Sequence, residues 1–162
     1  VNTPATDGFY VAKQLANIAK EGGYDLVIGG RESIDYNGGM VPGMIAKLTG
    51  ANFVNMCNSL EVEGTNATVA REIDGGKEII NTTLPLVVGG QKGIVEEADL
   101  RIPNMRGIMQ ARSKPLNVKE PIEANTETKI TGFSKPDSKG SVKLVGNVDE
   151  LIDLLHNEAK VI

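Results

Sequence analysis

The 162 residues include one cysteine, one histidine and no tryptophan. A single cysteine cannot form a disulfide within the chain, which favours a reducing compartment such as the cytoplasm. Metal sites need several clustered ligands, so Cys57 and the lone His156 predict no metal site. We expect His156 to lie on the surface or near a helix end.

No apolar run approaches the ~20 residues that a membrane-spanning helix needs, and the first residues lack a signal-peptide pattern. The net charge of −4 argues against a general nucleic-acid-binding surface. Zinc-ligand spacings, a P-loop lysine and the motifs of a catalytic triad are also missing. These absences favour a protein that neither inserts into membranes nor binds nucleic acid. With 40% hydrophobic residues, the chain can still form an ordinary core.

The first 56 residues alternate between helical and strand patterns. Residues 4–23 predict a helix that Thr6 or Asp7 caps and that glycines end. Its predicted apolar face consists of Val11, Leu15 and Ile18. The continuous apolar run at 26–28 predicts a parallel strand buried on both faces. A glycine-rich loop, a short helix ending at Gly50 and a strand from residue 51 follow, which indicates a doubly wound α/β sheet.

Residues 58–90 have a different pattern. Three strand-like runs cover 59–64, 67–76 and 77–90, and the turn signals "GTN" and "DGG" separate them. In the first run, Leu60 and Val62 alternate with glutamates. We predict an antiparallel arm over about 58–84, whose last segment, "LPLVV", returns to the core.

The remaining residues are more polar. Residues 91–101 form a charged connection, 105–115 predict a short helix, and 116–147 are extended. Residues 147–161 predict a helix with Asn147 as its cap. The apolar stripe of that helix would consist of Val148, Leu151, Leu155 and Ala159. We predict an α/β nucleotide-binding domain over 1–116 and a C-terminal extended segment and helix over 117–162.

The stretch "GGRESIDYNGGMVPG" (residues 29–43) joins a strand to a helix. In open α/β sheets, ligands bind outside the carboxyl ends of the strands. Glycines there let backbone amides approach a phosphate, and the helix start adds its positive dipole end. Ser33, Asp35 and Asn37 offer short side chains for ribose hydroxyls or an adenine edge. The alternative is a plain tight turn, because the stretch matches neither standard phosphate-binding fingerprint.

Three segments together resemble the electron transfer flavoprotein beta subunit. The first is "YDLVIGGRESIDYNGGMVPGMIA", which resembles that family's strand followed by G-[KR]-x-[AS]-I-D. The second is "LEVEGTNATVAREIDGGKEIINTTLPLVV", which resembles its V-x-R-x-(I/L/M)-(D/E)-G-G arm. The third is "RIPNMRGIMQARSKPL". They occur in the family's order over residues 24–116. The resemblance begins partway into the family's chain, so we expect a fragment that lacks the N-terminal strand and helix completing the nucleotide site.

The resemblance implies a Rossmann-like parallel sheet of the adenine-nucleotide alpha-hydrolase type with an antiparallel β arm. It implies pairing with an alpha subunit that holds most of the electron-carrying FAD, and binding of AMP or a second FAD in this subunit. The heterodimer would shuttle electrons from flavin dehydrogenases, such as acyl-CoA dehydrogenases, to a quinone reductase. Bifurcating relatives can instead accept electrons from NADH. No catalytic residue is expected, because the protein supplies binding, orientation and electrostatic tuning.

The resemblance also implies site residues. Cofactor-binding candidates are Gly30, Arg31, Ser33, Ile34, Asp35, Asn37, Gly38, Gly39, Met40 and Val41. The family usually has an acidic residue where Asn37 stands and an amide or threonine near Met40, so side-chain contacts there depart from its pattern. Partner-binding candidates in the family's dehydrogenase-recognition loop are Ile94, Val95, Leu100 and Arg101. The alternative for that loop is a solvated connection.

Two other functions compete. A small nucleotide-binding stress or signalling protein of the same fold would explain the α/β half but not the antiparallel arm. An adenylating enzyme would need a pyrophosphate-binding loop such as S-G-G-x-D-S, which is absent. In the arm, Arg71 could reach the alpha subunit or brace the arm, and we expect Glu72 and Asp74 to be surface charges.

Overall fold

The computed structural model describes residues 7–35 and 37–162, and these form two compact units that meet between Lys129 and Ile130. Thr6, one of the two predicted caps of the first helix, lies outside the described residues. The predicted domain boundary at residue 116 stays a prediction. Each unit is described by itself below.

Helix α1 (Gly8–Gly22) begins at Asp7, whose carboxylate accepts a 2.7 Å hydrogen bond from the Tyr10 N–H, so Asp7 is confirmed as the cap. The helix ends at Gly23, which has a φ of 61°. The predicted apolar face is not the most buried one: Val11 and Ile18 are half-buried and Leu15 is 43% exposed. The buried face instead consists of Ala12, Gln14, Ala16 and Ala19. Small side chains let α1 lie close against a neighbouring helix.

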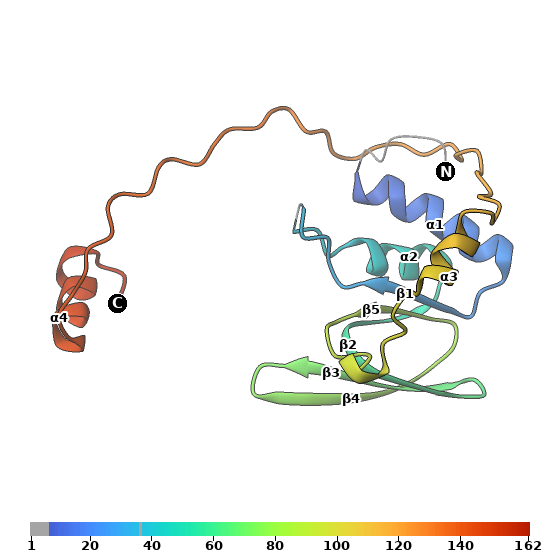
Figure 1. Cartoon of the computed structure of the whole chain (residues 1–162), viewed down its shortest axis with the longest axis horizontal. Coiled ribbons are helices and arrows are strands. Elements are labelled where there is room, and N and C mark those ends of the chain that lie inside the picture. Colours follow the sequence, from blue (N-terminus) through green and yellow to red (C-terminus); the bar gives the residue numbers. More distant parts are fainter. Residues whose placement is uncertain (1–6, 36) are drawn as a thin grey trace. The chain divides into compact units, whose positions relative to one another are not determined.

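That neighbour is α2 (Val41–Thr49), and both helices cover one face of three parallel strands. The parallel strands are β1 (Leu26–Gly30), β5 (Leu86–Gly90) and the first part of β2 (Asn52–Glu63). In Figure 1 the two helices lie on one side of β1 and β5. Val87 of the middle strand is buried beneath them. The predicted α/β class is therefore confirmed.

Beyond its parallel part, β2 continues into an antiparallel meander with β3 (Asn66–Ile73) and β4 (Gly76–Thr83), giving the order β1-β5-β2-β3-β4. The predicted arm is confirmed. Residues 51–56 and 59–64, expected as two strands, form one strand that bends where its register with β5 shifts between Val54 and Cys57. The run 77–90, expected as one strand, is two, because Pro85 has no N–H to continue a ladder.

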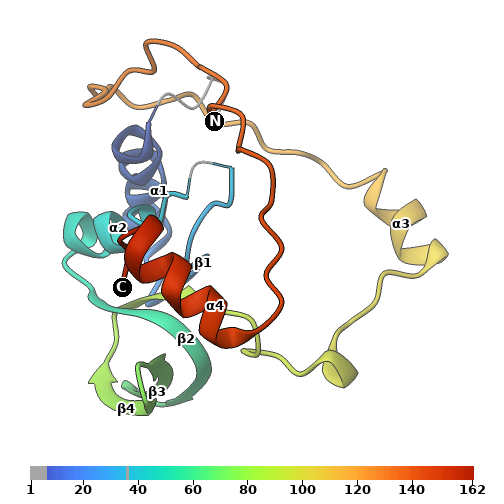
Figure 2. The same cartoon turned by 90° about the vertical axis from the view of Figure 1, so that its left-hand side faces the viewer.

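The bend in β2 brings the arm under the parallel strands, on the side away from the helices (Figures 1 and 2). Ala67 and Val69 of β3 pack there against Leu86 and Val88 of β5, and all four are almost fully buried. The predicted return of "LPLVV" to the core is thus confirmed. The arm is a structural layer of the domain.

The rest of the first unit contains a 3₁₀ turn (Glu97–Asp99) and the helix α3 (Met105–Ala111). Asn104 caps α3 by accepting a 2.8 Å hydrogen bond from the Gly107 N–H. The helix stops four residues before Pro115, where we expected its end. No helix or strand follows before α4 in the described chain.

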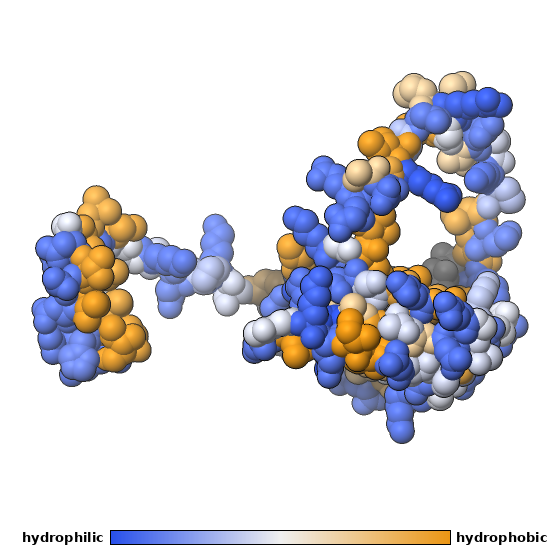
Figure 3. Space-filling model, turned by 90° about the horizontal axis from the view of Figure 1, so that it is seen from below, coloured by the Kyte–Doolittle hydropathy of each residue, from blue (hydrophilic) through white to orange (hydrophobic). Residues whose placement is uncertain are grey.

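The second unit consists of an extended segment and a C-terminal helix. Helix α4 (Val148–Asp153) continues into a π-helical turn, Leu154–Glu158, and Asn147 caps it as predicted by accepting from the Glu150 N–H. His156 is exposed, as expected. Val148 is 68% exposed, and Figure 3 shows apolar side chains gathered along this helix. Across the described part of the chain, no helix has the length and apolar character to span a membrane.

Candidate functional site

Two glycine pairs mark the carboxyl ends of adjacent parallel strands. Gly29 and Gly30 of β1 stand in register with Gly89 and Gly90 of β5. Without Cβ atoms, the backbone at this end of the sheet is open to close approach by a ligand. This edge is also where ligands bind in open α/β folds.

Asn55 of β2 borders this end of the sheet. A Cβ added to Gly89 would lie 1.9 Å from the Asn55 Oδ1, so the amide occupies the space that the glycine leaves. The same Oδ1 is buried and has no hydrogen-bond partner in the described chain. Next along the strand, burial raises the pKa of the Cys57 thiol, whose Sγ donates to the Ser59 carbonyl.

The predicted loop leaves β1 and turns back on itself before α2. Ser33 and Gly38 exchange two backbone hydrogen bonds of 2.9 and 3.1 Å, and Asn37 has a positive φ of 54°. Asparagine tolerates this conformation better than most residues. Ile34 is 91% exposed, and the side chains of Ser33, Asp35 and Asn37 are exposed as well. The loop therefore presents polar groups to solvent.

Helix α2 begins without a side-chain cap. Its N-cap residue, Met40, makes no capping hydrogen bond, and a proline stands in the first turn. The N–H groups at the start of a helix are unsatisfied by the helix itself and carry its positive dipole end. A bound anion could satisfy them. The backbone groups of Gly38, Gly39 and Val41 lie around this start.

Arg31 is turned toward the arm. Its guanidinium donates to the Glu32 carboxylate at 2.7 Å and to the Gln91 Oε1 at 3.2 Å. The Gln91 amide in turn donates to Glu72 of β3 at 2.6 Å. A hydrogen-bonded chain thus connects the loop, the end of β5 and the arm.

A second contact lies within the arm itself, between charged side chains on neighbouring strands. Arg71 pairs with Glu78 across β3 and β4, so of its two predicted roles the structure shows the bracing one. Glu72 and Asp74 are exposed, as expected of surface charges, and Glu72 accepts a hydrogen bond from the Gln91 amide. Sequence reasoning missed Asn55 and Gln91, whose positions depend on the pairing of distant strands.

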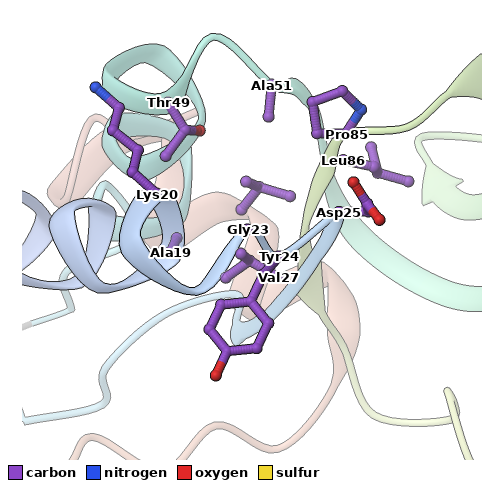
Figure 4. Close-up of a pocket in the computed structure, with 11 residues that line it drawn as sticks. Ala19, Lys20, Gly23, Tyr24, Asp25, Val27, Thr49, Ala51, Pro85 and Leu86 are labelled. Carbon is purple, nitrogen blue, oxygen red and sulfur yellow. The ribbon is translucent and has the colours of Figure 1, made fainter.

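A hollow of about 200 Å³ lies at the opposite, amino end of the parallel strands. Figure 4 shows Tyr24, Asp25, Thr49 and Pro85 around it. It is smaller than a typical ligand pocket of ~300 Å³ or more and lies away from the carboxyl ends. We therefore take the glycine-rich end as the candidate site.

The predicted partner-binding residues separate into two groups. Ile94 packs against the core beneath β5. Val95 and Leu100 are 50% and 53% exposed, and Arg101 is exposed. The sequence analysis did not single out Met105 and Met109, two exposed apolar side chains of α3. They are 73% and 66% exposed and lie four residues apart on the helix. In residues 7–35 and 37–162, no three His, Cys, Asp or Glu side chains are grouped to hold a metal ion.

Comparison with known proteins extends this description. The family described as the electron transfer flavoprotein domain matches residues 3–124. The chain is 34% identical to the electron transfer flavoprotein subunit beta of Bacillus subtilis, over 96% of this chain and 64% of that protein. It is 33% identical to the subunit beta of Syntrophomonas wolfei, over 85% of this chain and 53% of that protein. The mitochondrial subunit beta of Arabidopsis thaliana is 33% identical, over 94% of this chain and 61% of that protein. The chain thus spans between about half and two thirds of the length of these curated relatives.

Proposed function

The chain belongs to the electron transfer flavoprotein family, and we propose that it forms the nucleotide-binding part of a beta subunit. This subunit pairs with an alpha subunit that carries the redox-active FAD. The heterodimer accepts electrons from flavin dehydrogenases, such as acyl-CoA dehydrogenases, and passes them to a quinone reductase. In keeping with the single cysteine, we place it in the cytoplasm.

The proposed nucleotide site rests on one observation: Gly29 and Gly30 of β1 line the same hollow as Val41 and Pro42 at the uncapped start of α2. Backbone N–H groups of Gly39 and Val41 would bind a phosphate there, while Gly38 shapes the turn through its hydrogen bonds with Ser33. Side chains of Ser33, Asp35 and Asn37 would bind ribose hydroxyls or an adenine edge. The nucleotide is AMP or a second FAD, since both carry an adenosine phosphate.

The other candidate residues have supporting roles in this proposal. Arg31, held by Glu32 and Gln91, fixes the first residue of the loop to the arm, and Gly30 keeps the strand end open. Ile34 and Met40 are 91% and 55% exposed and would cover a bound adenosine. The fold is then of the adenine-nucleotide alpha-hydrolase type.

No residue of this chain makes or breaks a covalent bond in the proposed function. A bound flavin supplies the redox chemistry, and this subunit supplies binding and orientation. For the dehydrogenase, the exposed side chains of Val95, Leu100 and Arg101 form the docking surface, with Ile94 anchoring the loop to the core.

The competing function is a nucleotide-binding stress or signalling protein of the same fold. It requires the α/β half but gives no reason for the arm, which packs against Leu86 and Val88 of β5. The family match spans both. We therefore favour the electron-carrier subunit.

The test is to co-express the full-length gene product with its neighbouring flavoprotein gene, purify the complex, denature it and quantify the released nucleotides. One FAD and one AMP per heterodimer would indicate an ordinary electron shuttle. Two FADs and no AMP would indicate a bifurcating one. A colourless homodimer without flavin would overturn the proposal and favour the signalling protein.

A further inference from the structure

We propose that Gln91 is a positioning residue for the proposed nucleotide site, and that Glu72 of the arm affects nucleotide binding through it. Gln91 follows directly after β5 and acts on the site through Arg31. Its role rests on the proposed function, whereas its contacts belong to the structure whatever the site binds. These contacts connect Gln91 with residues that lie 60 and 19 positions away in the chain.

The backbone of Arg31 lies between two glycines at the end of the sheet. A Cβ added to Gly89 would lie 3.3 Å from the Arg31 Cα, and one added to Gly39 would lie 3.2 Å from the Arg31 carbonyl oxygen. The Arg31 N–H also donates to the Gly90 carbonyl at 3.1 Å. Because closely packed atoms cannot move independently, a displacement of Arg31 would also shift Gly39. Gly39 supplies one of the N–H groups that we propose for the phosphate.

The backbone of Gln91 is held on both sides. Its N–H donates to the Cys57 carbonyl of β2 at 2.8 Å, and its carbonyl accepts from the Ile94 N–H at 3.3 Å. The side chain therefore extends from a fixed point at the end of the sheet. Its Oε1 accepts from the Arg31 guanidinium at 3.2 Å, and its Nε2 donates to the Glu72 carboxylate at 2.6 Å.

The two charged neighbours set the orientation of the Gln91 amide. A guanidinium only donates hydrogen bonds and a carboxylate only accepts them, so the oxygen points to Arg31 and the nitrogen to Glu72. Removal of the Glu72 carboxylate would leave the amide free to turn away from Arg31. The other partner of the guanidinium, Glu32, is the next residue of the same loop. It moves with the loop, so it cannot replace Gln91 as a link to the sheet.

Preorganisation of the loop determines the expected effect on affinity. A loop that is already held in its binding geometry loses less conformational freedom when a ligand binds, so the affinity is higher. The hydrogen bond between Gln91 and Arg31 is partly buried, and the one between Gln91 and Glu72 is exposed. The loss of both should therefore cost no more than one ordinary hydrogen bond, which corresponds to about fivefold in affinity.

The affinity for AMP tests the proposal. It is measured by titration calorimetry on the nucleotide-stripped, full-length gene product, together with the alpha subunit where the two co-purify. We expect Gln91→Met, which has a similar length but no hydrogen-bonding amide, to weaken AMP binding about fivefold. Glu72→Ala should weaken it about two- to threefold. The double variant should bind no more weakly than Gln91→Met alone, because both changes act through the same amide.

The direction of the Glu72 effect separates this role from simple electrostatics. Removal of a carboxylate should by itself strengthen the binding of an anion, because less charge repels it. Asp74→Ala removes another exposed carboxylate of the arm and measures that contribution. It should leave the affinity for AMP unchanged or slightly higher. Equal effects of Glu72→Ala and Asp74→Ala, or wild-type affinity in Gln91→Met, would overturn the proposal.

Hydrogen–deuterium exchange measured by mass spectrometry provides a readout without nucleotide. In the nucleotide-free protein, peptides that contain Gly39 should exchange faster in Gln91→Met and in Glu72→Ala than in wild type. Gln110→Met, which changes an exposed glutamine of α3, is the matched control and should exchange there as wild type does. Wild type that binds neither AMP nor FAD would overturn the proposed function and with it the role of Gln91. Wild type that binds AMP, with variants that change neither affinity nor exchange, would overturn the role of Gln91 alone.

Discussion

The side-chain amide of Gln14 forms two hydrogen bonds with the backbone of Ile122, a residue 108 positions away. Its Nε2 donates to the Ile122 carbonyl and its Oε1 accepts from the Ile122 N–H, both at 2.9 Å. Lys119 pairs with Glu21 at one end of α1, and the N–H groups of residues 127 and 128 donate to Asp7 at the other. Residues 119–128 thus form a strap along α1, although they have no regular secondary structure of their own.

The strap depends on Gln14, which is 5% exposed. We expect Gln14→Ala to destabilise the protein by about 1–3 kcal/mol, because two hydrogen bonds are lost and the Ile122 backbone groups are left to water. Urea unfolding measures the loss. Lys13→Ala, on the same helix, is the matched control and should have little effect. Unchanged amide exchange at Ile122 in Gln14→Ala would show that the strap is held by other contacts.

Asp7 makes the strap sensitive to acid. Hydrogen bonds from the Tyr10 N–H and then from the Thr128 N–H lower the pKa of this carboxyl below its ordinary value of 3.8. A folded-state pKa below the unfolded one means that protons favour the unfolded state. The stabilisation is therefore present above pH 3.8 and is lost as the pH falls through the folded-state pKa.

We expect wild type to be more stable than Asp7→Asn at pH 7, because the neutral amide mimics the protonated carboxyl. The difference should shrink as the pH falls below about 4. Urea unfolding at a series of pH values measures it. A difference that stays constant from pH 7 to pH 2.5 would mean that the charge of Asp7 contributes nothing.

Whether a sequence-based prediction succeeded depended on how far apart in the chain the interacting residues lie. Asp7 and Asn147 were recognisable as caps because capping involves residues two or three positions apart. The loop at residues 29–43 was recognisable because strand, glycines and helix follow one another. The buried face of α1 was not recognisable from the sequence, because Leu15 lies beside the outer edge of β1, where no other part of the described chain covers it. Gln91 reaches the loop only through the pairing of distant strands.

The start of α2 offers a test of the proposed nucleotide site in the proposed full-length heterodimer. We expect Met40→Asp to weaken AMP binding about tenfold, because a carboxylate at the N-cap would compete for the N–H groups and repel a phosphate. Met40→Asn, of the same shape but uncharged, is the control. Titration calorimetry with AMP on nucleotide-stripped protein gives both affinities. Equal affinities would place the phosphate away from this helix start.

Gly89 and Asn55 provide a test of why the strand ends are glycines. We expect Gly89→Ala to destabilise the protein by about 1–3 kcal/mol, because its Cβ would lie 1.9 Å from the Asn55 Oδ1. Asn55→Ala should cost little, since that oxygen is buried without a partner. The double variant should then be more stable than the sum of the two single effects predicts, because the clash disappears with the amide. Urea unfolding of all four proteins gives this coupling energy. Additive effects would mean that Gly89 is required by the nearby Arg31 backbone, which a Cβ would approach to 3.3 Å, and that Asn55 leaves its position at little cost.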